Sequence, residues 1–282
     1  MTTQSKSTLD HNLILAARQG LVPESGNGWL GGFRNMMVKE LGDWFSTRRW
    51  IVQTIIWLAI VNGLMAFIMF AVPTIDPEGA QISAEENLAM GLSLFFNFTV
   101  LFGAIGMIIL AQDEIIEEKQ IGTAAWILSK PVSRSAFVLT KLFSNLVGSL
   151  IFIVGLTGAV AYAEIYLASG QALPVLPYLV GTGIVLLTLI FYLTLVIMLG
   201  TFFEQRGAVL GIAVGVLLGG LISSQFTPLT SYFLPVKMPD IALGVMQGQP
   251  LPMIAVSQLV TTGVWSLLFT ILALWRFSRE EF

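Results

Sequence analysis

The sequence lacks most of the side chains on which catalytic and metal sites depend. It contains no cysteine, so neither a disulfide nor a thiolate metal site can form. Its one histidine, His11, lies near the N-terminus, where a solvated side chain is a simpler interpretation than a ligand. The long apolar runs contain no Ser/His pair, His/Glu cluster or pair of carboxylates. We therefore expect no catalytic residue and no metal site, and an intramembrane protease or transferase is disfavoured.

Charge is scarce as well. Only 11% of the 282 residues are charged, whereas 55% are hydrophobic and the mean hydropathy is +0.82, far above the value of a soluble domain. A bilayer core is crossed by about 20 apolar residues in a helix. Uncharged runs of sufficient length cover 50–75, 87–112, 142–163, 165–203, 207–236 and 241–275. The composition therefore predicts an all-α integral membrane protein.

Each uncharged run is interpreted as a single crossing. The two longest contain the proline-rich stretches "QALPVLPY" and "QGQPLP", which are typical of loops. Six transmembrane helices are predicted, at 50–73, 87–111, 138–165, 176–202, 207–224 and 254–276. Residues 29–282 then form a single six-span domain behind a cytoplasmic tail, 1–28. For that tail, a mobile segment and a short surface helix over "TLDHNLILAARQGL" both remain open.

The basic residues indicate the orientation, because Lys and Arg are retained on the cytoplasmic side of a membrane. With the N-terminus inside, thirteen of the fourteen Lys and Arg residues fall on the cytoplasmic side, and Lys237 falls outside. We therefore predict that both termini and the loop Asp113–Phe137 are cytoplasmic.

The predicted spans carry no charge at mid-depth. Glu164 follows Phe137 by 27 residues, which is about 40 Å of helix, whereas the hydrocarbon core is roughly 30 Å thick. We expect Glu164 at the outer surface, and we expect Lys141 to extend its ammonium to the inner surface. A carrier driven by protons or sodium usually has a carboxylate at mid-depth, so that class is disfavoured.

Residues 29–49 precede the first span and predict a helix lying in the inner interface. Its expected apolar stripe contains Leu30, Phe33, Met37, Leu41, Trp44 and Phe45. Arg34, Lys39, Glu40 and Asp43 fall outside that stripe. A membrane anchor and a contact with a partner protein are equally compatible with this pattern.

Small and neutral polar residues mark the second and fifth spans. Gly207, Gly211, Gly215 and Gly219 recur every fourth residue, which lets another helix approach closely. Packing within one subunit is favoured over a subunit interface. In the second span, Phe96, Asn97 and Thr99 fall at mid-depth, and core packing is favoured over a substrate-facing wall. These three residues, with Gly211, Gly215 and Gly219, are our candidates for a substrate path or subunit interface.

The loop between the second and third spans concentrates charge around an apolar turn. Gly122 permits a break, Thr123 is a candidate N-cap for a short helix over 124–129, and Pro131 would end it. Ser133 or Ser135 can cap the third span. A solvent-facing apolar turn framed by charges favours a docking role. The turn contains Trp126, Ile127 and Leu128, and the framing charges are Glu117, Glu118 and Arg134.

This loop carries a resemblance to a known family. The stretch "EEKQIGTAAWILSKPVSRSAFVLTK", 117–141, resembles the central segment of ABC-2 type permeases, the membrane subunits of ATP-binding-cassette exporters. "MVKELGDWFSTRRW" is similar to the family's N-terminal interfacial helix, and "ALWRFSREEF" to its basic C-terminal end. The resemblance implies that the loop holds a cytoplasmic coupling helix that contacts an ATPase. The implied contact residues are Glu117, Glu118, Gly122, Thr123, Trp126, Ile127, Leu128, Pro131 and Arg134.

The resemblance also implies partners. Two permease subunits, identical or different, would form the pathway, and a cytoplasmic ATPase dimer would dock on the coupling helices. The chain contains no G-x-x-x-x-G-K-[ST] phosphate loop, so we expect no cofactor in it, with ATP and magnesium on the ATPase. Membrane lipids are expected partners and nucleic acids are not. The expected location is the inner, cytoplasmic membrane of the cell, and the segment 226–252 would be a partly re-entrant outer gate.

The expected activity is the transport of an amphiphilic or lipid-like substrate, since no charge lies at mid-depth. Two other functions remain open. One is a non-transporting subunit that transmits ATPase-driven motion to an extracytoplasmic complex, and the other is a polytopic scaffold without an ATPase.

Overall fold

The computed structural model describes residues 28–75, 82–128, 132–227 and 229–280. Throughout these ranges the regular structure is helical, without a strand. Six helices are long and apolar enough to cross a membrane, which confirms the all-α fold and the six predicted spans. They are Arg49–Ile75, Ala84–Gln120, Arg134–Ser169, Val175–Phe202, Arg206–Ser223 and Met253–Ser278.

Each of the first three spans consists of more than one helical segment. Span one is continuous through α3 (Arg49–Trp57), η1 (Leu58–Asn62), α4 (Gly63–Ala66), η2 (Phe67–Ala71) and α5 (Val72–Ile75), where η marks wide π-helical turns. Span two is α6 (Ala84–Ala111) with its extension α7 (Ile116–Gln120). Span three is α9 (Arg134–Gly148), η3 (Ser149–Gly155) and α10 (Leu156–Ser169).

The remaining elements are simple helices. Spans four, five and six are α11 (Val175–Phe202), α12 (Arg206–Ser223) and α15 (Met253–Ser278). Before the first span lies α2 (Phe33–Phe45), and α8 (Thr123–Leu128) lies between spans two and three. The short helices α13 (Thr230–Phe233) and α14 (Met238–Met246) lie between spans five and six.

Serine side chains set the start of two spans. Ser83 Oγ accepts a hydrogen bond from Glu86 N, and Glu86 Oε2 accepts one from Ser83 N at 2.8 Å, forming a capping box. Span two therefore begins at Ala84, three residues before the predicted boundary. Ser133 Oγ accepts from Ala136 N at 3.1 Å, which confirms Ser133 as the cap of span three.

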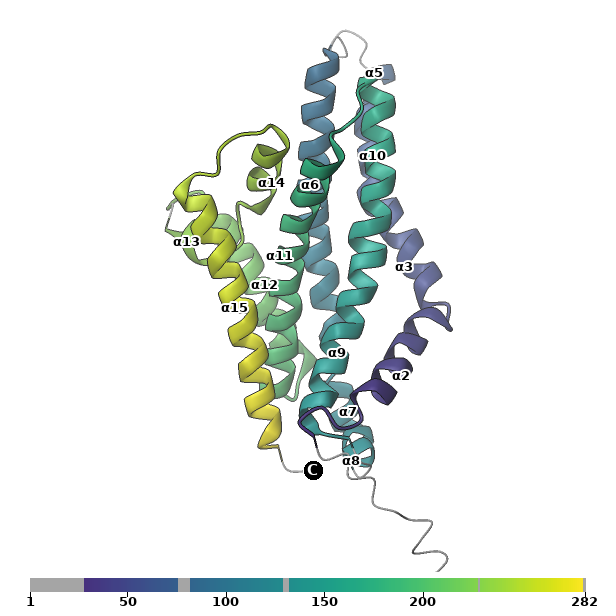
Figure 1. The fold of residues 1–282 in the computed structure, drawn as a ribbon, viewed down its shortest axis with the longest axis vertical. Helices are drawn as coiled ribbons and strands as arrows, with labels where there is room; N and C mark the ends of the chain where they lie inside the picture. Colours follow the sequence, from purple (N-terminus) through teal and green to yellow (C-terminus); the bar gives the residue numbers. More distant parts are fainter. Residues whose placement is uncertain (1–27, 76–81, 129–131, 228, 281–282) are drawn as a thin grey trace, which may run out of the picture.

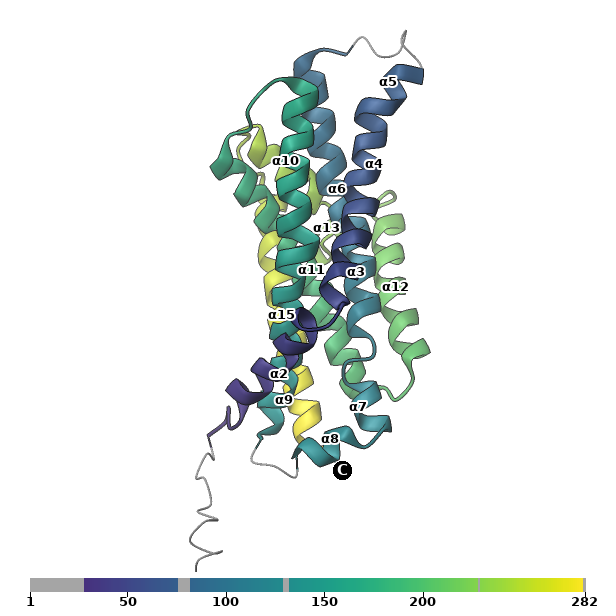
Figure 2. The same ribbon diagram turned by 90° about the vertical axis from the view of Figure 1, so that its right-hand side faces the viewer.

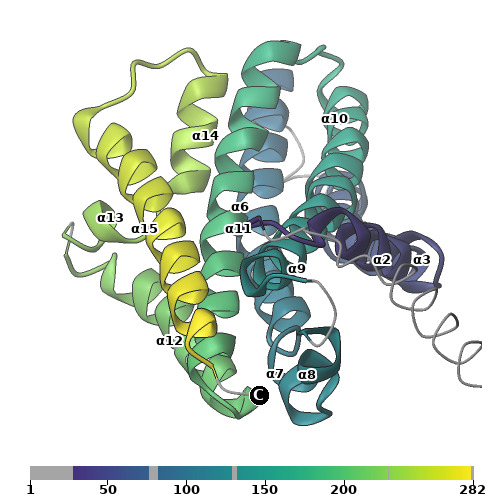
Figure 3. The same ribbon diagram turned by 60° about the horizontal axis from the view of Figure 1, so that its bottom comes forward.

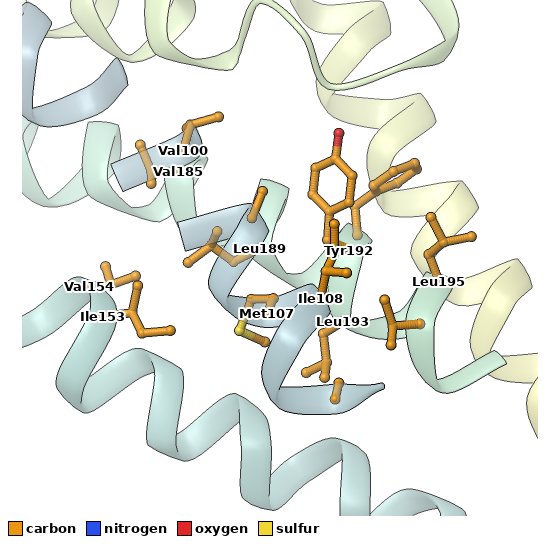
Figure 4. Close-up of a cluster of buried hydrophobic side chains, with 14 of the residues drawn as sticks. Val100, Met107, Ile108, Ile153, Val154, Val185, Leu189, Tyr192, Leu193 and Leu195 are labelled. Carbon is orange, nitrogen blue, oxygen red and sulfur yellow. The ribbon is translucent and has the colours of Figure 1, made fainter. Parts of the chain in front are cut away.

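The fourth span is the centre of the bundle. In its most apolar stretch, 72% of α11 is buried, compared with 22% for α12 and for α15. Figures 1 and 2 show α11 between α6 and α15. The core is formed by aliphatic side chains of α6, η3 and α11 (Figure 4), among them Met107, Ile108, Ile153, Val154, Leu189 and Leu193. The outer spans therefore expose apolar faces that lipid or another subunit must cover.

Two tryptophans of the N-terminal part pack against glycines. The Trp57 ring occupies the place that a Cβ at Gly106 of α6 would take. A Cβ at Gly148 would come within 2.6 Å of the Trp44 ring. Glycine at these two sites therefore lets α2 and α3 lie close to spans two and three.

The segment between spans five and six folds back onto the bundle. α14 packs against both α11 and α6, and it buries Met238, Ile241 and Ala242. In Figure 1, α13 and α14 lie below the ends of α5, α6 and α10. Both helices therefore lie toward the end of the bundle opposite α7 and α8.

Candidate coupling site

The charged loop between spans two and three forms a helical elbow at one end of the bundle (Figures 1 and 3). The elbow consists of α7, a turn at Gly122 and α8. Gly122 has a φ of 72°, a left-handed conformation that glycine adopts without strain. The predicted break at Gly122 is therefore confirmed.

The short helix after the break begins one residue earlier than predicted. Thr123 is its first residue rather than its cap, since Trp126 N donates to Gly122 O at 3.2 Å. The expectation that Thr123 is the N-cap is wrong because Gly122, already turned by its positive φ, supplies the first helical carbonyl. Pro131, which is predicted to end this helix, lies outside the described residues.

Of the three apolar residues that form the turn on α8, one is exposed. Trp126 is 62% exposed, whereas Ile127 is 8% exposed. Leu128 is partly buried against the core of the chain. The prediction that all three side chains are presented to a partner is therefore wrong for Ile127 and Leu128. Those two fasten α8 to the bundle, and Trp126 faces outward.

Behind the elbow, a buried lysine gathers three carboxylates. Lys141 Nζ lies 3.0 Å from Glu40 Oε2, 3.3 Å from Glu114 Oε2 and 2.5 Å from Glu118 Oε1. Lys141 and Glu40 are each 5% exposed. We call Glu40, Glu114, Glu118 and Lys141 the Lys141 cluster. Charges this deeply buried are tolerated only when they are paired, so the cluster fixes three elements relative to one another.

The cluster corrects two expectations. Lys141 does not extend into solvent, because α2 lies across α9 and the elbow closes the other side. Glu40 does not lie off the packed face of α2, whose buried residues are Met36, Glu40 and Trp44. The buried residues are spaced by four and therefore lie on one face of the helix. The middle one, Glu40, is the acid that pairs with Lys141.

Arg49 connects the first span to the same cluster. Its Nη2 donates to Glu114 Oε1 and to Asn145 Oδ1, each at 3.4 Å. The guanidinium carbon also lies 4.1 Å from the centre of the Trp44 ring, a cation–π distance. The start of α3 is thereby held against the elbow and against α9.

The later spans are tied to the elbow by separate ion pairs. Lys119 Nζ lies 2.8 Å from Glu280 Oε1, and Arg276 Nη1 lies 2.7 Å from Glu280 Oε2. Arg206 Nε at the start of α12 lies 2.8 Å from Asp113 Oδ1. These pairs link the region of the elbow to span five through Arg206 and to span six through Arg276.

Arg134, a predicted site residue, joins the start of span three to the C-terminal end of the chain. Its Nη1 donates to the carbonyls of Ser278 at 2.8 Å and Glu280 at 2.5 Å. One turn further along α9, the Phe137 ring stacks on Phe277 with 5.0 Å between centroids. The structure thus brings Glu118 and Arg134 into contacts within the chain.

A polar cleft of about 410 Å³ opens between the elbow and span one. It is lined by Arg49, Asp113, Glu114, Glu117 and Lys141 among others. Glu117 therefore faces the cleft, while Trp126 lies on the exposed side of α8. The elbow has one side built into the network and one side available for contact.

The candidate path residues do not come together. Phe96 and Thr99 are fully buried in the core of the chain. Asn97 is exposed, and its Nδ2 donates to Ser93 O on its own helix at 2.8 Å. The structure therefore brings Asn97, but neither Phe96 nor Thr99, to the surface of the subunit.

The glycine ladder of α12 is open to the outside. Gly207, Gly211, Gly215 and Gly219 are exposed, and none has a described heavy atom within 4 Å of an added Cβ. The favoured expectation of packing within one subunit is wrong for the described part of the chain. The residues that α12 buries are Val209, Ala213, Leu217 and Gly220.

Glu164 makes a side-chain contact with the first span. Its Oε2 accepts a hydrogen bond from Asn62 Nδ2 at 3.3 Å, and the same nitrogen donates to Thr157 O at 3.0 Å. Asn62 is 3% exposed and ends the first π-helical turn. Sequence distance placed Glu164 along its helix but did not reveal this partner.

Glu40, Arg49, Glu114 and Lys141 are site residues that sequence reasoning did not include. One signal pointed to them: Lys141 is a lone charge two turns into an apolar helix, and such a charge requires a partner. Glu114 and Glu118 also share a helical face through their spacing of four. Nothing in the order of residues showed which acids would reach the lysine.

Comparison with known proteins gives one family. Residues 34–282 match the model of the ABC-2 family transporter proteins. No curated protein matches the chain. The matched region contains all six spans and the complete elbow, and it begins one residue into α2.

Proposed function

Because the chain belongs to the ABC-2 family of transporter proteins, we propose that it is the permease subunit of an ABC exporter for an amphiphilic or lipid-like substrate. ATP and magnesium would bind to a separate ATPase subunit on the cytoplasmic side. The observation that carries the proposal is the elbow, which presents Trp126 outward while its inner side is ion-paired to Lys141 of span three.

The elbow is suited to convert a push into a movement of the spans. A force on α8 would pass through Ile127 into the core and through Glu118 to Lys141. Lys119 and Asp113 would pass it to spans six and five. Since buried ion pairs resist separation, the elements would move together rather than slide independently. ATPase closure at Trp126 would therefore tilt several spans at once.

A second permease subunit would cover the open face of α12. Gly211, Gly215 and Gly219 leave a backbone groove without a partner among the described residues, and small residues of this kind allow helices to associate closely in lipid. We place the contact between two subunits, identical or different, on this face. We also place both termini on the cytoplasmic side of the cell membrane, with the ATPases.

Co-purification tests the proposal. The chain is co-expressed with the candidate ATPase, and Trp126→Ala is compared with the wild type for capture of the ATPase and for stimulation of its hydrolysis. Aromatic anchors often cost about 2 kcal/mol on truncation, so we expect about 30-fold weaker association. The matched control is Trp50→Ala, which removes a tryptophan that is 41% exposed at the start of α3.

The outcomes separate the remaining functions. Normal capture and normal hydrolysis with Trp126→Ala would overturn the coupling role of α8. Absence of any captured ATPase with the wild type would favour the scaffold. Capture and stimulation without lipid movement in reconstituted vesicles would favour the subunit that transmits force to an extracytoplasmic complex.

A further inference from the structure

A pocket of about 500 Å³ lies at the end of the bundle opposite the Lys141 cluster. The end of α12, the helix α14 and the first turns of α15 enclose it. Its lining combines the buried polar side chains of Ser231 and Gln258 with one cation, Lys237, and one anion, Asp240. The pocket is therefore not a simple gap between apolar helices.

The depth of the pocket matches the headgroup region of a bilayer. Gln258 precedes Arg276 by 18 residues on α15, which is about 27 Å of helix. Ser224 follows Arg206 at the other end of α12 by the same number of residues. The hydrocarbon core is about 30 Å thick. If Arg206 and Arg276 mark one boundary of the membrane, the pocket lies at the opposite boundary.

The charges at the pocket are a matched pair. Lys237 Nζ lies 3.6 Å from Asp240 Oδ2, and their side chains are 45% and 65% exposed. An exposed pair of this kind contributes little to stability, so both groups are available to a ligand. A molecule that carries an anion and a cation a short distance apart can pair with both.

The start of α15 adds a second group that favours an anion. Pro252 occupies its N-cap position, and among the described residues no side chain caps the helix. Pro252, Ile254 and Ala255 line the pocket. Ala255 N donates to Pro252 O at 2.9 Å, so Ile254 is the lining residue whose N–H can point to a ligand. Free N–H groups at the start of a long helix bind phosphate well, and Lys237, which also lines the pocket, contributes a full positive charge.

The rim of the pocket is apolar and exposed. Of its lining residues, Phe226 is 84% exposed and Leu251 is 42% exposed. Aliphatic chains that extend from a bound headgroup would lie against these side chains. The polar lining and the charge pair therefore suit a polar headgroup, and the apolar rim suits the acyl chains of a phospholipid.

We propose that this pocket binds the headgroup of a zwitterionic phospholipid, with the phosphate at Lys237 and the first turn of α15, and the ammonium at Asp240. The phosphate and ammonium of an ethanolamine headgroup are joined by a short carbon chain, which suits charges held as closely as Lys237 and Asp240. The inference deepens the proposed function, and rests on it in treating the bound lipid as cargo at the exit of the permease.

Binding of short-chain lipids to the purified permease tests the site without an ATPase. The probes are dihexanoyl phosphatidylethanolamine, which is zwitterionic, and dihexanoyl phosphatidylglycerol, which is anionic. Isothermal titration in detergent micelles should give at least about tenfold tighter binding of the ethanolamine lipid, the factor that corresponds to 1.4 kcal/mol. Equal affinity of the wild type for both lipids would overturn the proposal.

Two variants assign the charges. Asp240→Asn leaves Lys237 without its opposing anion, so the preference should reverse toward the anionic lipid. Lys237→Gln should weaken the binding of both lipids by about tenfold. Asp43→Asn, at an exposed acid of α2, is the matched control and should behave as the wild type. An unchanged preference in Asp240→Asn would refute the assignment. Loss of lipid selectivity would not affect ATPase capture through Trp126, so failure of this inference and failure of the proposed function are distinguishable.

Discussion

Replacing Lys141 by Met should open the network that joins α2, the elbow and α9. The side chain is 7% exposed and lies within 3.3 Å of oxygens from Glu40, Glu114 and Glu118. Methionine fills similar volume but leaves three nearly buried carboxylates without their central cation. Removing one partner of a buried ion pair typically costs about 3–5 kcal/mol, which is more than a hundredfold in the equilibrium between closed and open forms.

A matched control exists on the same carboxylate. Lys39 Nζ also contacts Glu40, at 3.3 Å, but the side chain of Lys39 is 53% exposed. Exposed pairs contribute about 0–1 kcal/mol, so Lys39→Met should be almost neutral. Unfolding of the purified variants by dodecyl sulfate in mixed micelles, followed by circular dichroism, measures the difference.

A second substitution tests the electrostatic explanation. In the double variant Lys141→Met with Glu118→Gln, Glu114 still faces Arg49 at 3.4 Å and Glu40 still faces Lys39. Much of the lost stability should return, because the remaining acids have partners. If Lys141→Met loses no more stability than Lys39→Met, or if the double variant is less stable than the single one, the Lys141 cluster is not the joint that we describe.

Two further predictions concern packing and topology. Gly106→Leu should destabilise the monomer by at least about 1–3 kcal/mol, because the Trp57 ring fills that site. Gly215→Leu should leave the monomer stable and reduce the dimer fraction in cross-linking and light scattering. Equal effects of the two substitutions would contradict both placements. The chain has no cysteine, so Ser46→Cys and Gln171→Cys each create a single exposed site for labelling. An impermeant maleimide added to whole cells should label the Gln171 site alone. Labelling of the Ser46 site would contradict the predicted orientation.

The spans and their ends followed from local properties of the sequence. Six uncharged runs of sufficient length leave a helix as the structure that satisfies the backbone inside a bilayer. Ser133 and Gly122 act through their own backbone and nearest neighbours, so their roles as cap and break were readable from the chain.

The sequence could not show which side chains contact one another. Lys141 lies more than twenty residues from Glu114 and about a hundred from Glu40, and only the crossing of α2 over α9 brings these charges together. Ile127 looked as available as Trp126 until the bundle buried it. The four glycines of α12 looked like an internal contact, yet they face outward. A helix pattern identifies an apolar or polar face, but which neighbour covers that face depends on how all six spans pack around α11, because each contact is decided by the space that the others leave.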